Sequence, residues 1–128
     1  MRVLMCDPQH FRIGAEAPEL NPYMDLKNQP NRVRALEQFT SLRLLYTRLG
    51  IEVHVLKPRP DLFDQVFTAN TAWGIGNAFV MANLRPEWRQ PERVVIARWL
   101  AVHCFDVFWL PRHLFFEGQG DIITTKEA

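Results

Sequence analysis

The chain lacks the features that mark several large classes of protein. Its 128 residues contain no apolar run long enough to span a bilayer, and Asp7 comes too early for a secretory leader. Only two cysteines, Cys6 and Cys104, are present, which is too few for a disulfide framework or a cysteine metal site. We therefore expect a cytoplasmic protein that uses no metal.

The chain also has almost no excess charge. Its 15 basic and 14 acidic residues give a formal net charge of +1. Proteins that bind nucleic acid or anionic membranes usually concentrate basic side chains on one surface. The densest basic stretch, 85–98, also contains Glu87 and Glu92, so we interpret it as a solvated helix face. We expect neither nucleic acid nor a membrane as a partner.

Neither cysteine is predicted to be reactive. Cys6 ends a predicted buried strand and Cys104 adjoins an apolar run, so both are interpreted as inert buried thiols. His103 precedes Cys104, but adjacent side chains on regular structure point in different directions, which argues against a catalytic dyad. The other histidines occur singly and are not predicted ligands: His10, His54 and His113.

The first part of the chain predicts a strand, a long loop and a helix. The apolar run 2–6 predicts a buried strand, and 9–30 has no clear period, which indicates a loop of a length that often carries function. Asn31 and Gly50 suit the ends of a helix over 33–49. Its apolar face recurs at three- and four-residue steps and consists of Val33, Leu36, Phe39, Leu42, Tyr46 and Leu49.

The remainder predicts short strands around a second helix. Alternation predicts a half-buried strand over 51–55, and 66–73 with 77–82 predict a hairpin. Pro91 favours a helix start, and Val95, Trp99 and Val102 mark its apolar face. Further strands are predicted over 105–110 and 121–125. Helices that alternate with short strands favour the α/β class.

Three polar segments are candidates for a site. They are 64–70, Arg89 and 116–121, and the last places two carboxylates, Glu117 and Asp121, around glycines that let a backbone approach a ligand closely. On these residues alone, a role in turns and a role in function remain equally open.

Five motifs in a fixed order cover nearly the whole chain and carry a resemblance. They are Leu4-Met5-Cys6-Asp7-Pro8, Asn21-Pro22-Tyr23-Met24, Val66-Phe67-Thr68-Ala69-Asn70, Arg89-Gln90-Pro91-Glu92 and Phe116-Glu117-Gly118-Gln119-Gly120-Asp121. The chain resembles the amidinotransferase superfamily of guanidino-group-modifying enzymes, among them arginine dihydrolases and dimethylarginine dimethylaminohydrolases. Asn70 stands where arginine deiminases carry aspartate, so the bacterial arginine dihydrolase type is the nearest.

The resemblance implies a fold, an activity and a set of site residues. The fold is a five-bladed α/β propeller, of which residues 1–128 would form the N-terminal part, about two strand–strand–helix–strand blades. The activity is hydrolysis of C–N bonds in a small guanidino substrate such as arginine, without a cofactor. Glu117 would orient a catalytic histidine. The implied substrate-binding residues are Asn21, Asp64, Asn70, Arg89 and Asp121.

The implied roles agree with guanidinium chemistry. Asp64 and Asn70 would face the flat, five-donor cation, and Arg89 would grip the substrate carboxylate in a planar contact that lysine cannot reproduce. Asn21 would help to close the site, and Asp121 would lie beside the substrate or support its loop. Attack on the guanidinium carbon requires a thiolate and a general acid.

The family supplies its histidine and cysteine after the 116–121 motif. We therefore expect this chain to be inactive by itself. Two alternatives stay open: a small guanidinium-binding or regulatory module, and one half of a split enzyme that a complementary C-terminal half completes. Titration with arginine and an assay for ammonia release distinguish them.

A partial propeller predicts self-association. Uncovered strand edges and apolar faces favour association, and one aromatic group lies near the expected uncovered surface: Phe105, Phe108, Trp109, Phe115 and Phe116. Sedimentation of the isolated chain should show species larger than the monomer, or poor solubility. A clean monomer that binds no apolar dye would contradict this expectation.

Overall fold

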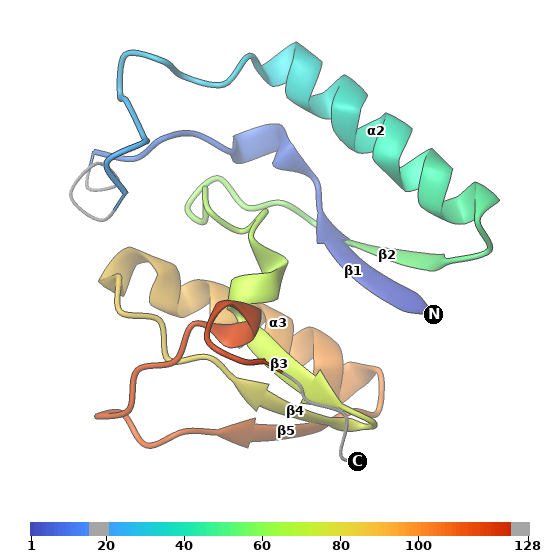
Figure 1. The fold of residues 1–128 in the computed structure, drawn as a ribbon, viewed down its shortest axis with the longest axis vertical. Coiled ribbons are helices and arrows are strands. Elements are labelled where there is room, and N and C mark those ends of the chain that lie inside the picture. The colour runs from blue at the N-terminus through green and yellow to red at the C-terminus, as the bar shows by residue number, and fades with distance from the viewer. Residues whose placement is uncertain (16–20, 124–128) are drawn as a thin grey trace. The chain divides into compact units, whose positions relative to one another are not determined.

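The structure consists of two compact units, each built around parallel strands and one helix. A computed structural model describes residues 1–15 and 21–123, which divide into unit 1 (Met1–Val66) and unit 2 (Phe67–Ala128). Figure 1 shows the elements of each unit. The mixed α/β class predicted from the sequence is confirmed.

Unit 1 is a strand–helix–strand arrangement. β1 (Arg2–Cys6) and β2 (Glu52–Leu56) pair in parallel from Arg2↔Glu52 to Cys6↔Leu56. Parallel neighbours need a crossover, which α2 (Arg32–Arg48) provides along the sheet (Figure 1). Within the described part of 7–31, a 3-10 turn, η1 (Pro8–His10), is the one helical element, so the long loop is confirmed there.

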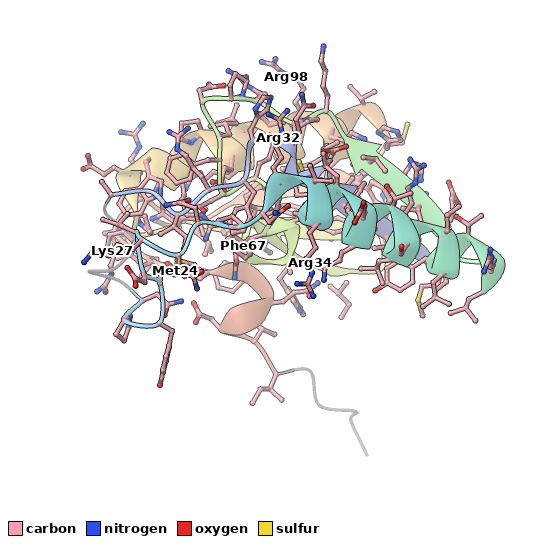
Figure 2. All side chains as sticks on the ribbon, turned by 90° about the horizontal axis from the view of Figure 1, so that it is seen from above. Met24, Lys27, Arg32, Arg34, Phe67 and Arg98 are labelled. Carbon is pink, nitrogen blue, oxygen red and sulfur yellow. The ribbon has the colours of Figure 1, made fainter. Side chains whose placement is uncertain are left out.

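The ends of α2 are as predicted, but the residues of its predicted apolar face are not buried. The Asn31 side chain accepts from the Arg34 backbone N–H at 3.0 Å, and Gly50 follows the helix at φ +72°. None of the 17 residues is buried, and Val33 and Leu49 are about two-thirds exposed. Arg32 and Arg34, labelled in Figure 2, are also exposed at the start of the helix.

Unit 2 contains a three-stranded sheet with α3 (Gln90–Val102) along it (Figure 1). β3 (Ala72–Ile75) is antiparallel to β4 (Ala78–Met81), and β4 is parallel to β5 (Asp106–Trp109). Its buried apolar residues are Ala72, Met81, Ala82, Leu84, Ile96, Ala97 and Leu100. The predicted helix face was wrong at Val102, which is 74% exposed, whereas Val95 and Trp99 are half-buried.

Two predicted strands needed correction. Thr68–Asn70 forms a 3-10 turn, η2, because the Thr71 hydroxyl and backbone both return to the Thr68 carbonyl, so the first hairpin strand begins only at Ala72. The two-residue turn that follows β3 is Gly76–Asn77, with Gly76 at φ +59°. No strand occurs over 121–123, and residues 124–125 lie outside the described part of the chain.

The helix cap of α2 supplies a test of the fold. Replacing Asn31 by alanine removes the acceptor for the Arg34 N–H and should lower the free energy of unfolding by about 1 kcal/mol. Asn28→Ala is the matched control, since Asn28 is exposed and caps no helix. Urea unfolding that gave equal stability for the two variants would contradict the capping role.

Candidate functional site

The predicted site residues are divided between the two units. Asn21 and Asp64 belong to unit 1, whereas Asn70, Arg89, Glu117 and Asp121 belong to unit 2. The Asn21 side chain accepts from the Tyr23 backbone N–H at 3.1 Å and so closes a local turn. Asp64 is 8% exposed, in a run of turns after β2. The contacts described next lie within unit 2.

Asn70 and Glu117 are brought together by one close backbone contact. Gly118 has φ +64°, and a Cβ placed on it would lie 2.5 Å from the Ala69 carbonyl oxygen and 2.7 Å from the Asn70 carbonyl carbon. Only glycine fits such a position. A Cβ on Gly120 would lie 3.9 Å from the side-chain nitrogen Nδ2 of Asn70. We expected these glycines to lie against a ligand. Gly118 and Gly120 instead lie against residues 69–70 of the chain itself.

The Glu117 segment is a turn held by Asp121. The Asp121 carboxylate accepts from the Glu117 backbone N–H at 2.7 Å, and the Asp121 N–H donates to the Gly118 carbonyl at 3.3 Å. The 3-10 turn η4 (Gly118–Gly120) lies between them. Both of these contacts of Asp121 lie within the turn itself.

Asn83 holds the segment that leads into this turn, and sequence reasoning missed it. Its backbone pairs with Phe116, and its buried amide nitrogen donates to the carbonyls of Arg112 at 2.8 Å and Leu114 at 2.9 Å. Its amide oxygen accepts from Arg93 at 2.6 Å. Burial lowers the pKa of Arg93, and the like charge of Arg112 adds to the effect. A lone asparagine after an apolar strand gave no pattern by which to find this role.

Arg89 forms a buried ion pair. It ends the 3-10 turn η3 (Glu87–Arg89) before α3, and its Nη2 and Nε lie 3.0 and 3.1 Å from Glu92 Oε2. The two side chains are 10% and 1% exposed. The interpretation of 85–98 as a solvated face was therefore wrong at these two positions, although Arg98 is exposed (Figure 2).

Arg89 also contacts the segment that carries Asn70. Its guanidinium carbon lies 5.5 Å from the centre of the Phe67 ring, and the Asn70 N–H donates to the Phe67 carbonyl at 3.1 Å. The Phe67 side chain is labelled in Figure 2. Through Phe67 and Gly118, the contacts within unit 2 connect Arg89, Asn70 and the Glu117 turn.

The cysteines lie elsewhere. Cys6 is buried at the end of β1, as predicted, but Cys104 is exposed, with φ +63°, so its predicted burial was wrong. Cys104 follows α3 and Arg89 precedes it, and a 13-residue helix separates them by about 20 Å. Among residues 1–15 and 21–123, no group of three or more His, Cys, Asp or Glu side chains could hold a metal ion.

Two glycines of unit 2 test the close backbone contact. Gly118 and Gly76 share a left-handed φ, but a Cβ at Gly76 meets nothing within 4 Å. Gly76→Ala should cost about 1–2 kcal/mol for the backbone conformation alone, and Gly118→Ala about 1–3 kcal/mol more for the clash. Equal losses in urea unfolding would show that the 118 contact does not constrain the turn.

Comparison with known proteins finds relatives named as enzymes of guanidino compounds. Residues 7–127 match the family described as N,N dimethylarginine dimethylhydrolase, eukaryotic. The whole chain is 32% identical to the bifunctional arginine dihydrolase/ornithine cyclodeaminase ArgZ of Synechocystis and spans 18% of its length. It is also 32% identical to N(G),N(G)-dimethylarginine dimethylaminohydrolase of Mycobacterium tuberculosis, covering 98% of this chain and 40% of that protein.

Solved structures agree with the sequence comparison. The N-terminal domain of ArgZ, in a form with one cysteine replaced by serine and substrate bound, matches with a TM-score of 0.81 at 31% identity. The match covers 94% of this chain and 43% of that domain. The family match covers far more than half of the sequence. The chain therefore belongs to the N,N-dimethylarginine dimethylhydrolase family.

Proposed function

We propose that residues 1–128 are the N-terminal part of the catalytic domain of an arginine-type guanidino hydrolase, and that this part binds the substrate but does not hydrolyse it. The observation that carries the proposal is the connected scaffold of unit 2. One glycine contact fixes the Asn70 and Glu117 segments to each other, and Phe67 joins them to Arg89. The contacts of this scaffold lie within unit 2.

The residue types suit the two ends of an amino acid that carries a guanidinium. Asn70 has an amide that both accepts and donates, which fits a guanidinium and the ureido group formed from it. Arg89 is a buried cation that binds the substrate carboxylate. Glu117 orients the histidine that protonates the leaving ammonia. Asp121 supports the Glu117 turn through its hydrogen bond to the Glu117 backbone N–H.

The nucleophile is not among the cysteines of this chain. Cys6 is buried and Cys104 follows the far end of α3 from Arg89. A thiolate must reach the guanidinium carbon directly, so a separation of about 20 Å leaves Cys104 out of reach. Ammonia release then depends on a histidine and a cysteine supplied from elsewhere.

The proposal includes a propeller architecture. Unit 1 and unit 2 each contain a strand–helix–strand arrangement with parallel strands, as two successive blades would. The relatives are longer than this chain, which spans 18% of ArgZ. The remaining blades of the domain would then come from sequence outside residues 1–128.

Calorimetric titration with arginine tests the proposed function. The unaltered chain should bind arginine and release no ammonia from it. Asn70→Ala removes one contact to a charged group and should weaken binding about tenfold. Asn28→Ala, an exposed asparagine of unit 1, is the matched control and should leave the affinity unchanged.

The outcomes separate the possibilities. Binding that Asn70→Ala weakens, without turnover, supports a recognition part of an enzyme. Ammonia release by the chain alone would contradict the absence of a nucleophile. A chain that remains folded yet does not bind arginine would contradict the proposal as a whole.

A further inference from the structure

We infer that Glu92 is a positioning residue that fixes which edge of the Arg89 guanidinium is offered to the substrate carboxylate, and so sets the preference for amino acids over decarboxylated amines. The inference rests on the proposed function, in which Arg89 binds that carboxylate. It adds a residue that never touches the substrate.

The geometry distinguishes two edges of the guanidinium, one of which Glu92 occupies. Arg89 Nε and Nη2 converge on Glu92 Oε2 at 3.1 and 3.0 Å, and Nε also lies 3.4 Å from Oε1. Guanidinium has five N–H groups in a planar fork. Glu92 takes the Nε–Nη2 edge, which leaves the Nη1–Nη2 edge for a second carboxylate. A planar two-pronged contact at that edge is the mode by which arginine binds carboxylates.

Burial makes this orientation rigid. The Glu92 side chain is 1% exposed and lies in the first turn of α3, where the helix dipole favours a carboxylate. The Phe67 ring lies 5.5 Å from the guanidinium carbon of Arg89. A cation held by a fixed carboxylate and an aromatic ring has lost most of its rotational freedom before a ligand arrives. Less conformational entropy is then lost on binding.

A purely structural role for Glu92 makes a different prediction. If the Arg89–Glu92 pair only stabilised the start of α3, breaking it would weaken the binding of every ligand of the site in the same proportion. If Glu92 orients Arg89, breaking the pair weakens the binding only of ligands that carry a carboxylate. Arginine and agmatine, which is arginine without its carboxylate, separate these two cases.

The test is calorimetric titration of the full chain with both ligands. The unaltered chain should prefer arginine to agmatine by about tenfold, as expected for a hydrogen-bonded contact between charged groups. Glu92→Gln keeps the shape and one acceptor, and should remove most of that preference by weakening arginine while agmatine changes less than about twofold. Glu87→Gln is the control, because it makes the same charge change at an exposed position of the neighbouring turn and should keep the preference.

Two results of the titration would overturn the inference. Equal weakening of arginine and agmatine by Glu92→Gln would assign Glu92 a structural role only and leave the proposed function intact. An unaltered chain that binds neither ligand would overturn the proposed function, and this inference with it.

A measurement on the unaltered chain covers the case in which Glu92→Gln does not fold. The Arg89 Nε–H proton should give a nuclear magnetic resonance signal that stays nearly unmoved when arginine is added, because Glu92 holds that edge. A large shift of this signal on addition of arginine would place the ligand on the Nε edge and contradict the inference.

Discussion

The candidate site depends on a single point of close packing, where Gly118 meets the backbone of Ala69 and Asn70. No other residue type fits there, since a Cβ would lie 2.5 Å from a carbonyl oxygen and the backbone is left-handed. This contact places the Glu117 turn beside the 3-10 turn that carries Asn70. The Asp121 carboxylate then closes the Glu117 turn from its other end. The positions of two polar side chains are thus set by backbone packing and one short hydrogen bond.

Buried polar groups connect the rest of the site to this contact. Asn83 joins the strand region to the segment before Glu117, and the Arg89–Glu92 pair anchors the start of α3. Burying these groups costs free energy unless each finds a partner. Unit 2 satisfies Asn83 with carbonyls 29 and 31 residues further along the chain, and it satisfies Arg89 with Glu92 three residues on. Such contacts favour one definite arrangement of the segments, which a recognition site requires.

Sequence patterns predicted the elements better than their packing. The two helices and four of the short strands lie close to where periodicity and capping residues placed them, as Asn31 and Gly50 illustrate. The predicted start of the hairpin failed because Thr71 bonds back to the Thr68 carbonyl, a local contact that strand propensity does not reveal. The prediction of the buried face of α3 was wrong at Val102, because tertiary contacts bury Ile96 and Leu100 instead.

The candidate site residues were singled out by the order of motifs and not by their chemistry. Asn70, Arg89 and Glu117 are ordinary polar residues when taken singly, and only their resemblance to a family singled them out. Glu92 and Asn83 escaped that reasoning. A glutamate in a basic stretch is typical of a solvated helix, and nothing in the sequence shows that this one is 1% exposed. Their roles follow from burial and distances, which only a structure supplies.

We propose that unit 2 holds a recognition site for arginine around Asn70 and the 117–121 turn. The most direct measurement follows the backbone amide signals of the glycines by nuclear magnetic resonance while arginine is added. We expect the signals of Gly118 and Gly120 to move until the site is saturated, while that of Gly76, in the hairpin turn of the same unit, stays in place. Signals that do not move, or a shift at Gly76 as large as at Gly118, would contradict it.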